Sequence, residues 1–201
     1  MHSAAMTAGA GNGISAVLHP NVPAVKSFWL SQLRRLRECE QVAAVCYRIR
    51  NGEIEFLLVR TNSGHWTFPK GNAEPGLTHA QAAALEAFEE AGVHGRMEEA
   101  SFTMYVRRKR GRMRGPGRSD RSVEDRSVEK EIAIQAHLCE VSRLEAPQEQ
   151  GRNPTWFSGK KAKRRLCEDR AADLAFELAR VVDRAVSRIS RLHDRALAVS
   201  R

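Results

Sequence analysis

The chain has 201 residues, of which 42% are hydrophobic, and its net charge is +9. This length suits one ordinary domain with extensions, and no apolar run approaches the roughly 18 residues of a membrane span. The positive charge favours anionic partners such as polyphosphates, nucleotides or nucleic acid. Its 4 cysteines are scattered without a C-x-x-C motif, which favours reduced thiols over a disulfide framework or a zinc site. Since no secretory signal pattern opens the chain, we predict a cytoplasmic protein with no membrane contact.

The first part of the chain has the composition of an extension. Residues 1–20 are rich in Gly, Ala and Ser, so we assign residues 1–25 to a disordered tail. From Phe28 to Leu36, apolar residues follow a helical period with arginines between them. This pattern predicts a short amphipathic helix that packs on the domain, and contact with a membrane surface or nucleic acid is the alternative.

Strand-like alternation starts near Gln41. It lies on both sides of Asn51-Gly52, a dipeptide that favours a two-residue hairpin turn. The predicted strands are 42–49, 53–61, 66–68, 101–107, 132–141 and 155–157. The predicted helices are 79–91, 159–167 and a long final helix, 169–198.

The helix at 79–91 has clear boundary signals. It lies within the stretch GNAEPGLTHAQAAALEAFEEAGV, which runs from Gly71 to Val93. Thr78 is a candidate N-cap, and Gly92 is a typical stop residue. The glycine-containing loop that opens into this helix presents backbone N–H groups to anionic oxygens, so the segment suits a phosphate ligand.

Three carboxylates lie near the end of this helix. Glu86, Glu89 and Glu90 fall at positions i, i+3 and i+4, so they share one face within a turn. Like charges at this spacing repel by roughly 0.2–0.5 kcal/mol per pair in an isolated helix. We therefore expect a counter-charge, and a hard divalent cation with oxygen ligands is the natural candidate, with Mg²⁺ first and Mn²⁺ as the alternative.

This stretch resembles the Nudix box, whose pattern is G, five residues, E, seven residues, R-E, an aliphatic residue, any residue, E-E, any residue, G and an aliphatic residue. The positions that match are Gly71, Glu86, Glu89, Glu90, Gly92 and Val93. The small Ala87 takes the first aliphatic position, whereas Leu77 replaces the first glutamate and Leu85 replaces the arginine. The flanking WTFPKG also resembles family members, and the resemblance covers about residues 40–168.

The two leucines have a physical interpretation. In the family, the first glutamate and the arginine pair and brace the loop against the helix. Losing one partner would leave the other charge unpaired, which costs roughly 3–5 kcal/mol of stability if that charge is buried. Replacing both partners by apolar groups is often neutral or stabilising. We therefore hypothesise that Leu77 packs on Leu85 and braces the loop in the same way. The alternative is a degenerate box and an inactive protein.

The resemblance also implies an architecture. It is an α+β fold of the Nudix type, an α/β/α sandwich with a mixed β-sheet between helices. We assign residues 26–168 to the Nudix domain with its N-terminal helix, and 169–201 to a C-terminal amphipathic helix. In this last helix one apolar stripe is formed by Leu174, Leu178, Val181, Ala185, Ile189 and Leu192. The end of the helix is a candidate homodimer contact, and packing on its own domain alone is the alternative.

Site residues follow from the same resemblance. The implied metal ligands are Gly71, through its carbonyl, Glu86, Glu89 and Glu90. The catalytic candidates are Glu86, Glu90 and Glu131, and Glu129 is the alternative to Glu131 as a further carboxylate before a later strand. Charge balance with nearby arginines is the other interpretation of this last pair.

A basic segment follows Arg107 and is rich in arginine and glycine. It is either a solvated loop between two strands or a collector of substrate phosphates, because arginine binds phosphate oxygens bidentately. The candidate substrate-binding residues are Arg60, Lys70, Arg107, Arg108 and Arg110. RNA is a weaker prediction as a partner, since few aromatic residues interleave with the arginines to stack on bases.

The predicted function is Mg²⁺-dependent hydrolysis of a diphosphate linkage. The resemblance implies a small phosphorylated substrate, a nucleoside diphosphate linked to another moiety. The WTFPKG segment before the box and the basic segment look most like those of family members that cleave diadenosine polyphosphates or diphosphoinositol polyphosphates. Two alternatives remain: a Nudix-fold module that senses a nucleotide without cleaving it, and a pyrophosphohydrolase that acts on RNA 5′ ends.

Overall fold

The hairpin predicted at Asn51-Gly52 is formed. In this computed structural model, which describes residues 41–110 and 129–199, β1 (Gln41–Arg50) pairs antiparallel with β2 (Glu53–Arg60). Asn51 has φ of 52° and Gly52 has φ of 78°. Positive φ at both central residues is what a type I′ turn requires, so the local signal decides this pairing.

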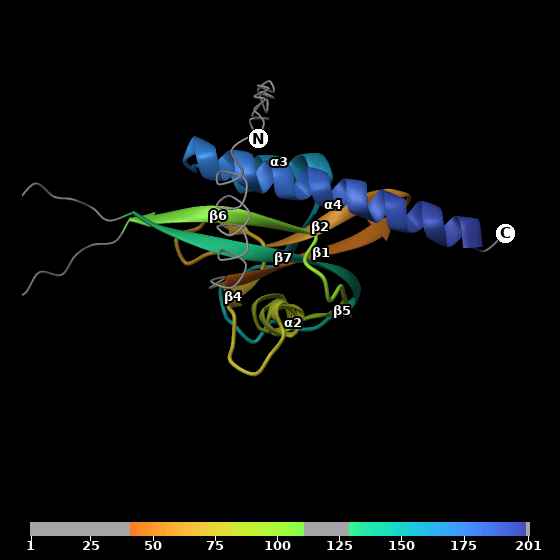
Figure 1. Cartoon of the computed structure of the whole chain (residues 1–201), viewed down its shortest axis with the longest axis horizontal. Coiled ribbons are helices and arrows are strands. Elements are labelled where there is room, and N and C mark those ends of the chain that lie inside the picture. The colour runs from red at the N-terminus through yellow and green to blue at the C-terminus, as the bar shows by residue number, and fades with distance from the viewer. Residues whose placement is uncertain (1–40, 111–128, 200–201) are drawn as a thin grey trace, which may run out of the picture. The chain divides into compact units, whose positions relative to one another are not determined.

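Within the described residues, the strands join in one mixed sheet. The other strands are β3 (Trp66–Thr67), β4 (Lys70–Asn72), β5 (Val93–Met97), β6 (Thr103–Arg110), β7 (Glu129–Leu144) and β8 (Thr155–Ser158). The order along the sheet is β3-β2-β1-β7-β5, with β4 paired to β1, β6 to β7 and β8 to β2 (Figure 1). β1 runs parallel to β7 and antiparallel to β2 and β4.

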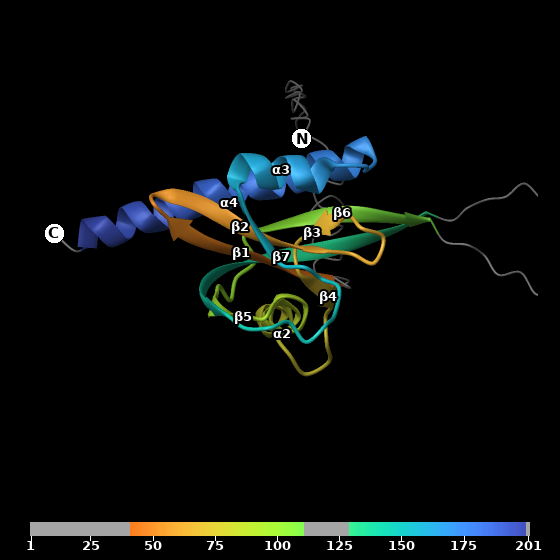
Figure 2. The same ribbon diagram turned by 180° about the vertical axis from the view of Figure 1, so that it is seen from behind.

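Helices cover both faces of the sheet. α2 (His79–Ala91) lies on one face, whereas α3 (Gly159–Cys167) and α4 (Ala172–Val199) lie on the other (Figures 1 and 2). Alternate residues of β1 enter two buried clusters, since successive side chains of a strand point to opposite faces. Those on the α3 and α4 side are Ala43, Val45 and Tyr47, and those on the α2 side are Val42, Ala44 and Cys46. The predicted α+β sandwich with a mixed sheet between helices is confirmed.

Two strands were not predicted from the sequence, and one of them, β4, helps to position the site. β4 was expected to be loop, and it is a strand because Gly71 and its neighbours pair with β1. β5 was not expected at all, since its sequence VHGRM lacks alternation, and it pairs antiparallel with β7 with an irregularity between His94 and Gly95. The last helix begins at Ala172 rather than at residue 169, because Asp169 has φ of 54° and interrupts the helical path.

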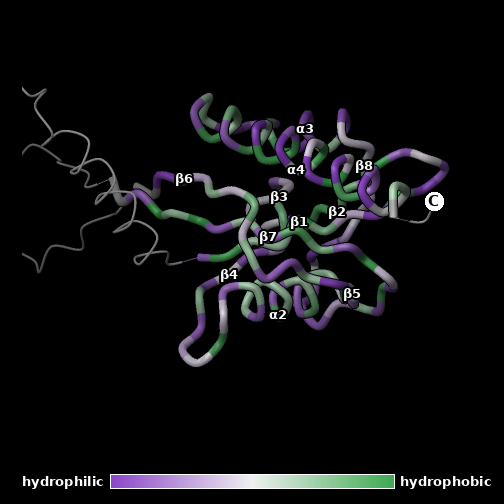
Figure 3. Tube along the Cα trace, turned by 45° about the vertical axis from the view of Figure 1, so that its right-hand side comes forward, coloured by the Kyte–Doolittle hydropathy of each residue, from purple (hydrophilic) through white to green (hydrophobic). Residues whose placement is uncertain are grey.

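The apolar stripe predicted on α4 packs on the sheet. Leu178, Val181, Ala185 and Ile189 are buried, and Leu174 and Leu192 are partly buried against the same cluster. Hydrophobic and hydrophilic residues alternate along the turns of α4 in Figure 3. The homodimer contact at the end of this helix stays a prediction. No helix in the described ranges is both long and apolar enough to cross a membrane.

Some predictions fall on other parts of the chain. The tail at 1–25 and the helix at Phe28–Leu36 lie outside the described residues, as does most of the basic segment, 111–128. The domain boundaries assigned from the sequence therefore stay predictions.

Candidate active site

The ends of α2 are fixed by its own sequence. Thr78 Oγ1 accepts a hydrogen bond from the Gln81 backbone N–H at 3.2 Å, and the Thr78 N–H donates to Gln81 Oε1 at 2.8 Å. This reciprocal pair is a capping box. At the other end Gly92 has φ of 63°, and a Cβ there would lie 2.1 Å from the Glu145 carbonyl oxygen. Only glycine fits this position, so the helix ends where its glutamates are presented.

The carboxylate of Glu86 lies directly against the backbone of Gly71. A Cβ on Gly71 would be only 1.5 Å from Glu86 Oε1, so this close approach requires glycine. The pairing of β4 with β1 holds Gly71 at this place. Burial and, to a smaller extent, the charges of Glu90, Glu89 and Glu149 together raise the pKa of Glu86 to about 7.

Glu90 is the most buried acid of this group, with 2% of its surface exposed. Its Oε1 accepts from Arg152 Nη2 at 2.7 Å, and its Oε2 accepts from the Lys70 backbone N–H at 3.2 Å. Burial raises the pKa of Glu90, whereas Lys70 and Arg152 act to lower it. Both oxygens of this carboxylate are therefore engaged by the protein.

Cationic groups gather around Lys70, which acts on the charges of Glu86 and Glu90. Burial lowers the pKa of the Lys70 ammonium; Glu90 opposes this shift, and the positive charges of Arg107, Arg152 and Arg170 add to it. Arg170 donates to the Trp66 carbonyl oxygen at 2.6 Å. The buried Nε atoms of Arg107 and Arg170 have no hydrogen-bond partner among the described residues. Buried donors without a partner suit an anionic ligand.

The donor set fits a hard divalent cation, although the side chains do not yet surround one. No three His, Cys, Asp or Glu side chains within 41–110 and 129–199 are placed together so as to hold a metal ion. Glu86 and Glu89, however, form no ion pair with another described residue, and after burial the negative charges of Glu90, Glu89 and Glu149 add to the raised pKa of Glu86. Carboxylate oxygens are the ligands that Mg²⁺ and Mn²⁺ prefer.

Other predicted residues lie elsewhere. Arg60 donates to the Gly64 carbonyl oxygen at 2.8 Å and stacks on the Trp66 ring, 4.5 Å from its centre. Arg108 pairs with Glu131 at 3.4 Å and with Asp173 of α4 at 3.5 Å. The described contacts of these residues do not include the α2 glutamates.

Glu131 is thus placed with α4 rather than with α2. It lines a cavity of about 330 Å³ together with Asp173, Phe176 and Glu177. It is not among the main charges that act on Glu86 or Glu90. The side chains of Arg110 and Glu129 lie outside the described part of the structure. The catalytic role of Glu131 stays a prediction that this placement does not favour.

Sequence reasoning missed Glu149 and Arg152. Both lie in the loop between β7 and β8, where the Glu149 N–H donates to the Glu89 carbonyl oxygen at 2.9 Å. Arg152 bridges Glu149 Oε2 at 2.6 Å and Glu90 Oε1 at 2.7 Å. Gly151 and Asn153 have φ of 78° and 47°, which turns the chain sharply around Arg152. The turn-forming sequence was visible, but nothing in it points to α2.

Comparison with known proteins decides the family. The family model described as NUDIX domain matches residues 40–174, which is most of the chain. The chain belongs to the Nudix family. The resemblance of the 71–93 segment is therefore confirmed, in spite of its two leucines.

The Nudix chain also has relatives over a shorter range. It is 48% identical over 48 residues to the asymmetrical bis(5'-nucleosyl)-tetraphosphatase of Sus scrofa, a match that covers 23% of this chain and 33% of that protein. The protein of the same description from Caenorhabditis elegans is 47% identical over 51 residues, which cover 24% of this chain and 37% of the relative. The matched segments thus span only about a third of these relatives.

Solved structures match over a longer range. The C. elegans Ap4A hydrolase in a binary complex has a TM-score of 0.50 at 22% identity, covering 75% of this chain and 96% of that one. The NUDIX domain of Shewanella oneidensis NrtR, complexed with ADP ribose, has a TM-score of 0.51 at 15% identity, with 74% and 86% covered. At these identities the likeness shows the shared fold.

Proposed function

We propose that this Nudix chain is a Mg²⁺-dependent pyrophosphohydrolase that cleaves a diphosphate linkage in a nucleoside diphosphate joined to another moiety. The observation that carries the proposal is the half-buried carboxylate of Glu86, which lies against Gly71 on the same helix turn as Glu89 and Glu90. Lys70 acts on its charge, and two of the arginines that act on Lys70, Arg107 and Arg170, have buried Nε atoms without a described partner. Acidic and basic groups side by side suit a metal-bound polyphosphate.

The cation would be held by Glu86, Glu89, Glu90 and the Gly71 carbonyl. When bound, Mg²⁺, or Mn²⁺ in its place, neutralises phosphate charge and stabilises the leaving oxygen. Glu90 would join this set only through an oxygen that Arg152 releases, since Arg152 holds its Oε1. Burial and the charges of Glu90, Glu89 and Glu149 disfavour the ionised form of Glu86, and a bound cation would offset both.

The protein's other groups would bind phosphate and accept a proton. Lys70 and Arg107 would bind phosphate oxygens, and the effect of the Arg107 charge on the pKa of Lys70 supports a shared site. We infer that Glu149, rather than Glu131, is the further carboxylate that accepts a proton from the attacking water. Glu149 is among the charges that raise the pKa of both Glu86 and Glu90. An ionised carboxylate at that place is a competent general base.

Dinucleoside polyphosphates are the substrate class that we propose. Support comes from the 48-residue segment that is 48% identical to an asymmetrical bis(5'-nucleosyl)-tetraphosphatase. Diphosphoinositol polyphosphates are the second class. A cytoplasmic location is proposed as well, because Cys46, Cys139 and Cys167 are free thiols, as expected in a reducing compartment.

The test is a substrate panel with the full chain and Mg²⁺. It includes diadenosine tetraphosphate, nucleotide sugars, oxidised nucleotides, inositol pyrophosphates and RNA with a 5′ triphosphate. We expect diadenosine tetraphosphate to give two nucleotides with different numbers of phosphates, and EDTA to stop the reaction. Release of pyrophosphate from RNA as the main activity would contradict the substrate assignment.

Two glutamine variants separate the candidate bases. Glu149→Gln should lower kcat by ~100-fold or more, which is the usual contribution of a general base. Glu131→Gln is the matched control and should retain activity, since Glu131 pairs with Arg108 and lies beside α4. Loss of activity in Glu131→Gln, with activity retained in Glu149→Gln, would assign the role of general base to Glu131.

A binding module that does not hydrolyse its ligand is the second candidate function. The occupied oxygens of Glu90 favour it, because Arg152 supplies the positive charge that a metal would otherwise bring. Calorimetry with diadenosine tetraphosphate and Mg²⁺ distinguishes the two. Tight binding of diadenosine tetraphosphate, with no product formed over hours from any member of the substrate panel, would support the binding module.

A further inference from the structure

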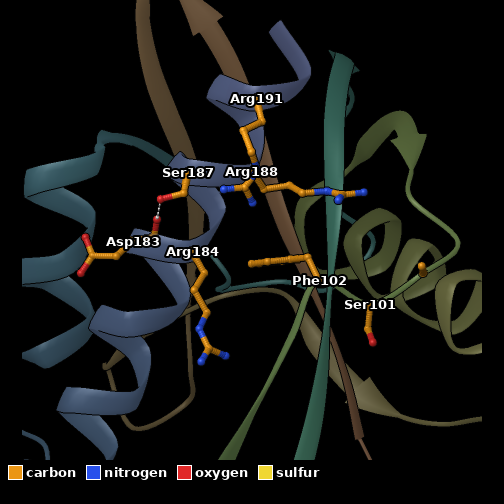
Figure 4. Close-up of a pocket in the computed structure, with 8 residues that line it drawn as sticks. Ser101, Phe102, Asp183, Arg184, Ser187, Arg188 and Arg191 are labelled. Carbon is orange, nitrogen blue, oxygen red and sulfur yellow. Dashed lines mark hydrogen bonds between the residues drawn. The ribbon is translucent and has the colours of Figure 1, made fainter. Parts of the chain in front are cut away.

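A cavity lined by several arginines lies on the face of the sheet opposite α2. It has a volume of about 490 Å³ and is lined by Phe102 and by Arg184, Arg188 and Arg191 of α4, together with Ser101 and Asp183 (Figure 4). Cavities of roughly 300–1,000 Å³ commonly hold small-molecule ligands. α4 packs on β6 and α3, whereas α2 packs on β1, β4, β5 and β7, so the sheet separates this cavity from the α2 glutamates.

The acids near this cavity are already engaged. Both carboxylate oxygens of Asp183 accept from Lys163 Nζ of α3, at 2.8 and 3.1 Å, and Figure 4 shows Asp183 directed away from Phe102. Glu98 accepts from Arg188 Nε at 3.2 Å and from its Nη2 at 3.4 Å. Neither acid is left to balance the remaining arginines.

Two arginines of the cavity therefore carry positive charge without an acidic partner in the described part of the chain. Arg184 donates to the Thr103 hydroxyl, which is neutral, and keeps its other donors free for a ligand. Arg191 forms no ion pair or hydrogen bond with another described residue. The hydroxyl of Ser101 lies on the opposite wall and adds a neutral donor.

The spacing of the two arginines indicates the kind of anion. Arg184 and Arg191 are seven residues apart, which is about 10 Å along a helix axis. A ligand that engages both guanidinium groups needs anionic groups at some distance from one another. Arginine matches phosphate through two parallel hydrogen bonds, which favours a chain of phosphates over a single small anion.

We propose that this cavity is a second phosphate-binding site, which takes a small ligand with two or more phosphate groups through Arg184 and Arg191. It is separate from the site that we propose for hydrolysis and needs no metal ion. Its ligand is held on a packed helix and the turn before β6, so binding there leaves the α2 glutamates free.

Amide NMR of the full chain, with tripolyphosphate as the probe and EDTA present, tests the site. We expect saturable shifts at the amides of Ser101, Phe102 and Ser187. EDTA removes metal-dependent binding at α2, and the position of the shifts distinguishes this cavity from the basic segment after β6.

Arg191→Gln and Arg195→Gln form a matched pair. Both residues are exposed on α4, but only Arg191 lines the cavity. Arg191→Gln should weaken binding at these amides by ~10-fold or more, as expected for a lost charged hydrogen bond, and Arg195→Gln by less than about twofold. Equal weakening in both variants would mean diffuse attraction to a basic helix. The proposal would be overturned by that outcome. It would also be overturned by an absence of shifts at these amides, or by an equal affinity for citrate.

Discussion

The face of the sheet covered by α2 and the face covered by α3 and α4 both carry charged residues, but they balance these charges differently. On the α2 face, Glu90 is 2% exposed and pairs with Arg152, whose side chain is 17% exposed. On the other face, the pair of Lys163 and Asp183 keeps 39% and 62% of its side chains exposed. The pair at the α2 face is thus largely buried, whereas the pair at the other face is solvated.

The apolar packing differs in the same way. α2 contacts the sheet mainly through small side chains, which are Ala80, Ala82, Ala83, Ala87 and Ala91. α4 contributes large ones, among them Leu178 and Ile189. Small contacts bring the α2 backbone close to the sheet, so that Glu86 reaches Gly71. We therefore expect the α2 face to contribute less apolar stabilisation than the α4 face, because smaller side chains bury less apolar area.

The largest expected effect tests this contrast through the two ion pairs. Arg152→Gln leaves the buried Glu90 without its partner and should lower the free energy of unfolding by roughly 3 kcal/mol, within the usual range for a broken buried pair. Lys163→Gln removes an exposed pair and should lower it by about 1 kcal/mol or less. Urea unfolding at neutral pH in EDTA measures both. Similar losses would show that the two faces are not different in this respect.

The next largest effect is expected from substituting alanine for a glycine of the candidate site, with a second glycine as control. In Gly71→Ala the new Cβ would meet Glu86 Oε1 at 1.5 Å, so the carboxylate must move and hydrolysis should fall by ~100-fold, as for a misplaced catalytic group. Gly159→Ala is the control on the α4 face, where the nearest atom would be 3.6 Å away, an ordinary contact. Initial rates with diadenosine tetraphosphate and melting temperatures should show lost activity in the first variant and an intact fold in both.

Local signals explain which parts of the fold were predictable. The hairpin at Asn51-Gly52, the cap at Thr78 and the stop at Gly92 act within a few residues of themselves, so the sequence shows them. β4 and β5 become strands only through their partners β1 and β7, which are distant in sequence. No local pattern could indicate these pairings.

Some residues of the candidate site could likewise be predicted from local sequence, and others could not. Glu86, Glu89 and Glu90 share a helix turn, so their proximity follows from spacing alone. Arg152 and Glu149 reach them from a loop beyond β7, and this contact depends on how the chain returns to α2. Glu131 was placed with the glutamates by its position before a strand, but its partners in the structure are Arg108 and the cavity beside α4.

A smaller effect concerns pH and Glu86. The pKa of Glu86 is about 7 in the fold against an ordinary value of 4.5, so the folded state keeps a proton that the unfolded chain loses between these values. The stability of the metal-free protein should therefore fall as pH rises from about 4.5 to 7, and Glu86→Gln should remove this loss. Since Glu86 is only partly buried, we expect a gain of about 1 kcal/mol for the variant above pH 7.

Unfolding in EDTA at pH 5 and pH 8 measures this difference. Glu53→Gln, at an exposed position of β2, is the control and should change stability by less than about 0.5 kcal/mol at either pH. Addition of Mg²⁺ should stabilise the wild type more than Glu86→Gln, because a ligand of the folded state adds its binding free energy. A variant that is less stable than the wild type at pH 8 in EDTA would contradict the charge argument.

The smallest expected effect concerns the two leucines of the box. Leu77 is 39% exposed, Leu85 is half-buried, and neither belongs to the two buried clusters. A double-mutant cycle of Leu77→Glu, Leu85→Arg and both together restores the charged pair at these positions. We expect a coupling energy of about 0.5 kcal/mol, typical of an exposed pair, which 1 M salt should reduce. A coupling near zero at low salt would mean that the two positions do not contact one another, and the bracing hypothesis would then fail while the site at Glu86 stood unchanged.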